Sequence, residues 1–373
     1  MIYLHVPFCR SFCTYCDFYS EIACKGRDEA AVTRWADEVC AEIAARREEI
    51  ESTLDLDTLY IGGGTPSVLP LSVLRQILDR INTIRDGQRH HSYTEFTIEV
   101  NPEDIIERGP EYVQGLLDLG VTRISMGVQS LDDGILRWMN RRHSADGAQK
   151  AFRILRDSFV LPCAVSIDLI TGVPGMTEEI LEKTLEEVIS WRPEHISAYQ
   201  LSIEEGSALA KMIEDGRVTE LGEEECRAQY ELVCRRLAEA GYRHYEISNW
   251  ALPGHEAVHN SAYWTRHPYA GLGPGAHSLS GGSTPKSPAA PELPTSPHCG
   301  SVPFSAVRSE ERKEKPQRRS WNSQQLSGWT SEGENLSPEE IHEEEVMLLA
   351  RTALGPIPEK DWFIADDIIP DLL

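Results

Sequence analysis

The sequence lacks the features that mark membrane proteins and nucleic-acid-binding proteins. No apolar run approaches the roughly 18 residues that a membrane span requires, so we expect no transmembrane segment. Basic residues are scarce: 36 Lys and Arg against 60 Asp and Glu leave a formal net charge of −24. Such a charge repels phosphate backbones and anionic lipid surfaces, and we therefore expect no nucleic-acid partner. The start, MIYLHVPFC, has no basic leader before an apolar stretch, which indicates a cytoplasmic protein without a secretory signal.

Cysteine is sparse but unevenly placed. The chain has 373 residues and 9 cysteines, an odd number, and three of them lie within residues 9–16. A disulfide framework explains neither observation, whereas a metal site in a reducing compartment explains both. With 40% hydrophobic and 26% charged residues, the chain can bury a substantial core. Its length suits one large domain of roughly 250 residues with a smaller appendage, or two ordinary domains.

Strand and helix patterns alternate along residues 1–201. Apolar, β-branched runs predict strands at Ile2–Val6, Thr58–Ile61, Glu95–Val100, Arg123–Val128, Ala164–Ile170 and His195–Leu201. Helical spacing predicts helices such as Glu29–Ile50, Leu71–Ile84, Ala145–Asp157 and Glu178–Ser190, the last with Thr177 as its N-cap. The alternation indicates the α/β class with parallel βαβ units. Six units can form a partial (β/α)6 barrel, related to the TIM barrel, with its chemistry at the carboxyl ends of the strands. A flat doubly wound sheet is the alternative that the sequence leaves open.

The pattern changes after Leu201, and the chain divides into four predicted regions. Residues 1–201 form the barrel, and residues 202–279 form a barrel extension with an acidic helix over Glu223–Ala240. Residues 280–319 are rich in Pro and Ser and then in charge, so we expect them to be disordered. Residues 320–373 carry one acidic helix, Pro338–Ala353, and are predicted to be a small, truncated, α-rich C-terminal region.

The three clustered cysteines follow the first predicted strand. Cys9, Cys13 and Cys16 have the spacing C-x3-C-x2-C, which places all three thiols on one short loop at the carboxyl end of that strand. A mononuclear zinc site requires a fourth ligand, for which Asp17 and Cys24 are the nearest candidates. A [4Fe–4S] cluster ordinarily takes four cysteines, so three would leave one iron open to a small molecule. The spacing alone leaves both metals open.

Polar and glycine residues stand at the ends of the later strands. The second strand runs into GGGTP, Gly62–Pro66, where glycine lets the backbone approach a ligand closely, although such a segment is commonly only a tight turn. Glu99, Gln129, Arg141 and Asp168 follow at or near later strand ends. Each alone is better explained by a structural ion pair or a capped loop. Four at successive strand ends favour a ligand pocket, because buried carboxylates need hydrogen-bond donors.

The segment CRSFCTYCDFY resembles the cluster motif of the radical S-adenosylmethionine (SAM) superfamily. The resemblance implies a partial (β/α)6 barrel in which Cys9, Cys13 and Cys16 bind a [4Fe–4S] cluster, with the amino and carboxylate groups of SAM on the fourth iron. It also implies that SAM contacts the glycine turn at Gly63, Gly64 and Thr65, with Tyr3 near its adenine. Glu99, Gln129, Arg141 and Asp168 would contact SAM from the later strand ends.

Further segments narrow the resemblance to the HemN/HemW family. Seven segments spread over most of residues 1–280 are similar, in the same order, to segments of that family: YIGGGTPS, EVNPED, RISMGVQS, DLITGVPG, HISAYQLSIEEGS, YEISNWA and GLGPGAHS. The oxygen-independent coproporphyrinogen dehydrogenases of this family have a fourth cysteine where Phe18 stands here, and a long segment before the cluster motif. Both departures point to the HemW heme chaperones. HNSAYW matches the HNxxYW motif associated with heme in that group, which implies heme contacts for His259, Asn260, Tyr263 and Trp264; the axial ligands are not assigned, and a lone histidine beside aromatic residues is more often a satisfied structural group.

The leading hypothesis is therefore a heme chaperone that holds [4Fe–4S], SAM and heme and hands heme to an acceptor protein, for which a respiratory cytochrome protein is one candidate. A homodimer, and whether the chain is an enzyme, stay open. The competing hypothesis is an oxygen-independent coproporphyrinogen III dehydrogenase. A zinc-stabilised barrel without a redox role is the third. The family's C-terminal domain is shortened here: EEEVMLLARTALG resembles its start and WFIADDIIPDLL its end, but its middle is missing. We expect this shortening to impair acceptor docking or stability.

Overall fold

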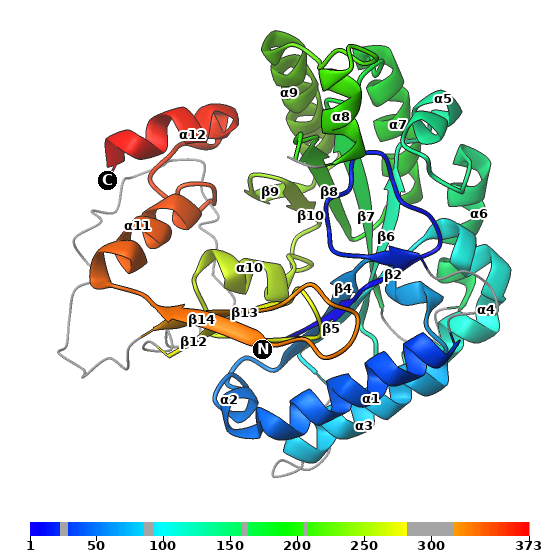
Figure 1. The fold of residues 1–373 in the computed structure, drawn as a ribbon. Coiled ribbons are helices and arrows are strands. Elements are labelled where there is room, and N and C mark those ends of the chain that lie inside the picture. The colour runs from blue at the N-terminus through cyan, green and yellow to red at the C-terminus, as the bar shows by residue number, and fades with distance from the viewer. Residues whose placement is uncertain (23–28, 86–92, 159–162, 205–206, 282–316, 373) are drawn as a thin grey trace.

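The computed structural model describes residues 1–22, 29–85, 93–158, 163–204, 207–281 and 317–372. Within these residues, the main body is a nine-stranded sheet of order β11-β1-β4-β5-β6-β7-β8-β10-β9 (Figure 1). Its six central strands are parallel: β1 (Ile2–Val6), β4 (Thr58–Gly63), β5 (Glu95–Val100), β6 (Arg123–Gln129), β7 (Ala164–Thr171) and β8 (His195–Gln200). The predicted strands and the α/β class are confirmed. Because these strands neighbour one another in chain order, right-handed crossovers place the helices on one face and the sheet curls into a partial barrel, not a flat doubly wound sheet.

Helices flank this sheet, most of them on its outer face (Figure 1). They are α1 (Glu29–Ala45), α2 (Arg47–Glu51), α3 (Leu71–Arg85), α4 (Pro102–Asp118), α5 (Asp133–Trp138), α6 (Ala145–Ser158), α7 (Glu178–Trp191), α8 (Ala208–Glu214) and α9 (Glu223–Glu239). Thr177 caps α7 as predicted, accepting a bond from the Ile180 N–H. The predicted helix Glu29–Ile50 is interrupted at Arg46, whose guanidinium donates to the Gly271 carbonyl and to Ser278. None of the helices in the described part of the chain has the length and apolar surface that crossing a bilayer needs.

Alternate residues of the central strands face opposite sides of the sheet. In β5, Phe96, Ile98 and Val100 join the hydrophobic core beneath the helices. The residues on the other face, Glu95, Thr97 and Glu99, are polar: Glu95 pairs with a buried arginine and Glu99 accepts a hydrogen bond from a tyrosine of β4. The interior of the barrel is therefore a hydrogen-bonded polar space, while the aliphatic core lies outside it.

The chain after β8 supplies both edges of the sheet. β10 (Asn249–Ala251) runs antiparallel to β8 and pairs with β9 (Arg243–Glu246), whereas β11 (Ala270–Leu272) runs parallel to β1 at the opposite edge. The short helix α10 (Val258–Trp264) lies between β10 and β11 in the chain and contacts β4. The connection between the two edges thus passes beneath the amino ends of the barrel strands. The predicted extension, residues 202–279, is continuous with the barrel sheet.

A second sheet precedes the C-terminal helices. Within the described residues it has three strands, β12 (His277–Ser280), β13 (Arg318–Asn322) and β14 (Ser331–Asn335). The predicted disorder of residues 280–319 is wrong at its ends, because Ser280 and Arg318 pair across β12 and β13; residues 282–316 lie outside the described residues. The C-terminal region is therefore not purely helical.

The helices that follow are shorter than predicted. α11 spans Pro338–Leu349, and the predicted helix to Ala353 ends early because Thr352 forms a bridge with Glu246. Short helical turns follow at Glu359–Ile364, α12 (Ala365–Ile368) and Ile369–Leu372. Trp362 is buried in this region.

Candidate functional site

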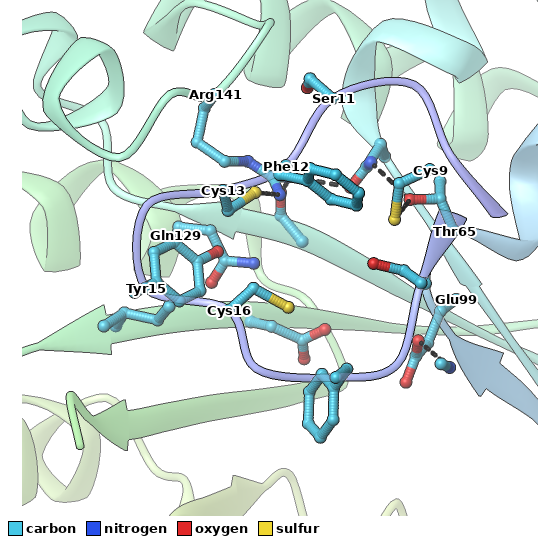
Figure 2. Close-up of a pocket in the computed structure, with 18 of the residues that line it drawn as sticks. Cys9, Ser11, Phe12, Cys13, Tyr15, Cys16, Thr65, Glu99, Gln129 and Arg141 are labelled. Atoms are coloured by element: carbon cyan, nitrogen blue, oxygen red, sulfur yellow. Dashed lines mark hydrogen bonds between the residues drawn. The ribbon is translucent and has the colours of Figure 1, made fainter. Parts of the chain in front are cut away.

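A cavity of about 480 Å³ opens at the carboxyl ends of the barrel strands (Figure 2). It is walled by the loop after β2 (Phe8–Cys9) and by the ends of the central strands. The structure brings together on its wall the three predicted metal ligands and seven of the predicted cofactor contacts. These are Cys9, Cys13, Cys16, Gly63, Gly64, Thr65, Glu99, Gln129, Arg141 and Asp168.

The cysteine loop is fixed to the barrel by backbone and side-chain hydrogen bonds. Thr14 donates from its N–H to the Met139 carbonyl at 3.2 Å and from Oγ1 to the Trp138 carbonyl at 2.9 Å. Asn140 donates from Nδ2 to the Phe12 carbonyl at 2.7 Å. The last turn of α5 therefore holds the loop, and with it the three thiols, over the barrel mouth.

The thiols surround the cavity. Figure 2 shows Cys9 beside Thr65 on one side and Cys13 beside Arg141 on the other, with Cys16 between them. Thr65 Oγ1 and Arg141 Nη1 each donate to the neighbouring sulfur at 3.5 Å. Burial raises the pKa of the Cys9 thiol and raises that of Cys16 to about 12, so both stay protonated unless a metal binds them.

Three cysteines without a fourth thiol fit a [4Fe–4S] cluster with one open iron. The described residues hold no set of three or more His, Cys, Asp or Glu side chains gathered closely enough for a single metal ion. Asp17, one candidate for a fourth zinc ligand, is exposed, and Cys24 lies outside the described residues. Because a four-iron cluster is wider than one ion, its thiolates stand farther apart than zinc ligands do, and the arrangement suits the cluster better.

The glycine turn after β4 passes against the cysteine loop. Gly63 has φ of +111°, a region that disfavours side chains. A Cβ on Gly64 would lie 3.0 Å from Cys9 Sγ and 2.9 Å from the Phe8 carbonyl oxygen. Glycine is therefore required here for the close approach of the two segments, which is more than a tight turn demands.

Two buried carboxylates face the cavity from inside the barrel. Glu99 accepts hydrogen bonds from Tyr60 Oη at 2.7 Å and from the Gly63 N–H at 3.2 Å, and burial raises its pKa to about 7. Asp168 accepts bonds from Ser125 Oγ at 2.8 and 3.0 Å, and burial raises its pKa as well. Both can accept further hydrogen bonds from hydroxyl or amino groups of a ligand.

Gln129 and Arg141 complete the wall opposite Cys9. Gln129 has φ of +66° at an irregularity in the pairing of β6 with β7, a backbone conformation that costs on the order of 1 kcal/mol. Arg141 Nη2 donates to Asn101 Oδ1 at 2.7 Å and to the Gly127 carbonyl at 2.8 Å, whereas its buried Nε has no partner among the described residues. The arginine is held by the protein and keeps a donor for an anionic group.

Three residues that line the cavity were not predicted from the sequence, and one predicted contact, Tyr3, lies outside it. Tyr60, Asn101 and Ser125 also line the cavity. Asn101 follows Glu99 in the EVNPE segment, and Tyr60 and Ser125 lie on the inward face of their strands, so strand alternation was the available signal. Tyr3 does not line the cavity: its hydroxyl contacts His5 Nδ1 at 3.1 Å. Its predicted adenine contact stays a prediction.

The HNxxYW residues lie at the opposite end of the barrel. His259 has 0% exposed surface; its Nδ1 bonds to Thr58 Oγ1 at 2.9 Å and its Nε2 to Tyr263 Oη at 3.0 Å. Asn260 donates to Glu246, and Trp264 is half-buried. Both ring nitrogens are thus hydrogen-bonded within the protein, and the motif is not part of the cavity. Its predicted heme contact stays a prediction.

The chain resembles known proteins over most of its length. It matches the family model of the radical SAM superfamily over residues 3–188. It is 35% identical over 283 residues to the heme chaperone HemW of Mycobacterium tuberculosis, covering 75% of this chain and 69% of that protein. It is 33% identical over 281 residues to heme chaperone HemW of Bacillus subtilis, covering 75% and 71%.

A solved structure gives an independent comparison of the fold. Coproporphyrinogen III oxidase (HemN) from Escherichia coli, a radical SAM enzyme, superimposes with a TM-score of 0.68 at 19% sequence identity. The match covers 93% of this chain and 74% of that one. At this identity the likeness concerns the fold alone, and it supports the barrel described above.

Proposed function

Because the chain belongs to the HemW family of the radical SAM superfamily, we propose that it is a heme chaperone that binds a [4Fe–4S] cluster, SAM and heme and transfers heme to an acceptor protein. The observation that carries the cofactor part is that one cavity is lined by three thiols, two buried carboxylates and an arginine whose Nε has no partner among the described residues. The names of the HemW relatives support the heme part. A cytoplasmic location, a homodimer and a respiratory acceptor belong to the same proposal.

The chain's own residues divide the work of holding the cofactors. Cys9, Cys13 and Cys16 would hold the cluster, which when bound supplies an open iron and an electron for cleaving the sulfonium C–S bond of SAM. Gly63, Gly64 and Thr65 offer a close-approaching backbone to the methionine end, and Gln129 adds an amide from the opposite wall. Arg141 offers its Nε as a donor to the carboxylate, and Glu99 and Asp168 accept bonds from ribose hydroxyls. The protein thereby orients SAM between the cysteine loop and the barrel interior.

Unlike the cluster and SAM, heme has no residue assigned to its iron here, because both ring nitrogens of His259 form hydrogen bonds within the protein. In this proposal His259 therefore does not supply an axial ligand to the heme iron, and heme contact through the other residues of the HNxxYW motif stays a prediction. The dehydrogenase alternative is disfavoured by Phe18, which is exposed at the cavity mouth where that branch has a cysteine. The two functions differ in their product, which is a heme-loaded acceptor for the chaperone and protoporphyrinogen for the dehydrogenase.

The test is anaerobic reconstitution followed by two assays on the same protein. We expect about four iron and four sulfide per chain, lost in Cys13→Ala and kept in the control Cys163→Ala, whose thiol is buried away from the cavity. Heme titration should give a saturable Soret band, and labelled heme should pass to an apo-cytochrome. Incubation with dithionite, SAM and coproporphyrinogen III should give no protoporphyrinogen. Turnover to protoporphyrinogen, or absence of heme binding, would overturn the chaperone proposal, and full iron content in Cys13→Ala would overturn the cluster assignment.

A further inference from the structure

The helix that carries the HNxxYW motif, α10, is anchored to the amino ends of the barrel strands, which we call the floor of the barrel. The N–H groups of Val258 and His259 donate to the Glu95 carboxylate at 3.0 and 2.9 Å. Glu95 lies at the start of β5 and also accepts a bond from Arg123 Nε at 3.1 Å. Arg123 in turn donates to the His255 carbonyl at 2.6 Å. The segment between β10 and β11 thus closes the amino end of the barrel through charge-assisted hydrogen bonds.

One route leads from His259 to the cavity. The His259 ring, held by Thr58 and Tyr263, packs against the Tyr60 ring with centroids 5.3 Å apart. Tyr60 then donates to Glu99 Oε1 at 2.7 Å, and Glu99 lines the cavity. Burial lowers the pKa of His259 to about 3, so the ring is neutral and one of its nitrogens donates while the other accepts. The position of the tyrosine hydroxyl is therefore fixed from below by the histidine.

A second route starts at the residue before α10. The Ala257 N–H donates to Tyr245 Oη at 3.4 Å, and that hydroxyl contacts His195 Nε2 at 2.8 Å. His195 Nδ1 contacts Ser166 Oγ at 2.8 Å, and Ser166 reaches Asp168 Oδ1 at 3.3 Å. Asp168 is the other carboxylate of the cavity. Both carboxylates are therefore connected through the barrel interior to the same short segment of the floor.

We propose that the HNxxYW helix positions the SAM-binding carboxylates, and that His259 is a positioning residue acting on Glu99 through Tyr60. The inference rests on the proposed SAM binding and replaces the role of His259 as a heme contact. For His259 to ligate iron through Nε2, it would have to give up its buried hydrogen bond to Tyr263 Oη, while Nδ1 could keep its bond to Thr58. Unpaired buried polar groups are disfavoured, whereas the positioning role uses every contact as it stands.

The test compares SAM and heme affinity in variants along the first route. Tyr60→Phe keeps the ring on His259 but removes the bond to Glu99, so the SAM dissociation constant should rise about tenfold, since a bond to a charged group is removed. His259→Ala should raise it about threefold, because it loosens Tyr60 without removing its hydroxyl. Both should leave the heme affinity and the Soret band unchanged. His255→Ala, an exposed histidine three residues before Val258, is the matched control and should leave both affinities unchanged.

A pH profile separates positioning from a general loss of structure. The Tyr60 hydrogen bond lowers the pKa of Glu99 against the effect of burial. In Tyr60→Phe, the pH below which SAM affinity declines should therefore move upward, which a merely destabilised protein would not show. If His259→Ala does not fold, Thr58→Val removes one hydrogen bond to the same ring and should raise the SAM dissociation constant in the same direction.

The outcomes distinguish this inference from the proposed function. Wild-type protein that takes up a cluster but binds no SAM would overturn the proposed function and the inference with it. Wild-type protein that binds SAM, with unchanged SAM affinity in Tyr60→Phe and His259→Ala or Thr58→Val, would overturn the inference alone. Loss of the Soret band in His259→Ala at unchanged SAM affinity would assign the histidine to heme binding and overturn its positioning role.

Discussion

The two ends of the barrel use the same kinds of residues differently, and two glutamates of β5 show it best. Glu95, at the floor, accepts bonds from Arg123 and from two backbone N–H groups of the segment that closes the barrel. Glu99, four residues later at the mouth, accepts bonds only from a phenol and one backbone N–H among the described residues. Burial raises the pKa of Glu99 to about 7. Removing the cation partner of a buried carboxylate is strongly destabilising, whereas a buried carboxylate without such a partner is kept at a cost and is available for a ligand.

The strongest test of this contrast removes the cation at the floor. Arg123→Met leaves Glu95 buried and without its partner, which should lower the unfolding free energy by about 3–5 kcal/mol. Urea unfolding of the metal-free protein measures the loss. The iron content per folded chain should stay at the wild-type value, because the cysteine loop lies at the other end.

The matched control is Arg47→Met, whose partner Glu51 is a surface residue and whose side chain is 54% exposed. That variant should change stability by no more than about 0.5 kcal/mol. An Arg123→Met protein as stable as the control would mean that the floor is not held by this ion pair, and the contrast between the two glutamates would fail.

A second prediction sharpens the comparison at the mouth. The pKa of Glu99 is raised from 4.5 to about 7 by burial, so the folded state binds its proton more tightly than the unfolded state. Stability from this group is therefore complete below pH 4.5 and is lost as the pH rises to about 7. Relative to Glu99→Gln, wild-type protein should lose about 2 kcal/mol between about pH 5.5 and about pH 7.5.

Unfolding curves of the metal-free proteins at several pH values would show this loss. Glu332→Gln, an exposed change in β14, serves as the control and should follow the wild type throughout. A constant difference between wild type and Glu99→Gln over this range would mean that Glu99 is already ionised at the mouth, like a partnered carboxylate.

Much of the mouth was predictable from the sequence, because the signals for it are local. β-branched runs located the six strands, and parallel strands bring their carboxyl ends to one edge. Glu99, Gln129 and Asp168 therefore had to meet near the loop of Cys9. Tyr60 was missed because it lies in the middle of a strand. Predicting it would have required knowing which of the two faces of that strand points into the barrel.

The floor was not predictable in the same way. The HNSAYW segment carries a histidine beside two aromatic residues, a pattern that also suits an exposed ligand site. Its burial depends on β11 pairing with β1, which joins residues 270–272 to residues 2–4. No local pattern reports a contact over that separation, so the sequence did not show that this segment is buried at the amino end of the barrel. The limits of the insert, residues 280–319, were misplaced for the same reason, since β12 and β13 pair across it.

The smallest expected effect concerns an aromatic residue at the rim of the cavity. Phe18 is 67% exposed and lines the cavity mouth, so it buries little apolar surface in the folded protein. Phe18→Ala should therefore change the unfolding free energy by less than about 0.5 kcal/mol and leave the iron content unchanged. Urea unfolding and iron analysis of the same sample measure both quantities. A loss of about 2 kcal/mol in the unfolding free energy would mean that Phe18 is packed as tightly as a residue at the floor. The contrast between a packed floor and an open mouth would then fail at this residue.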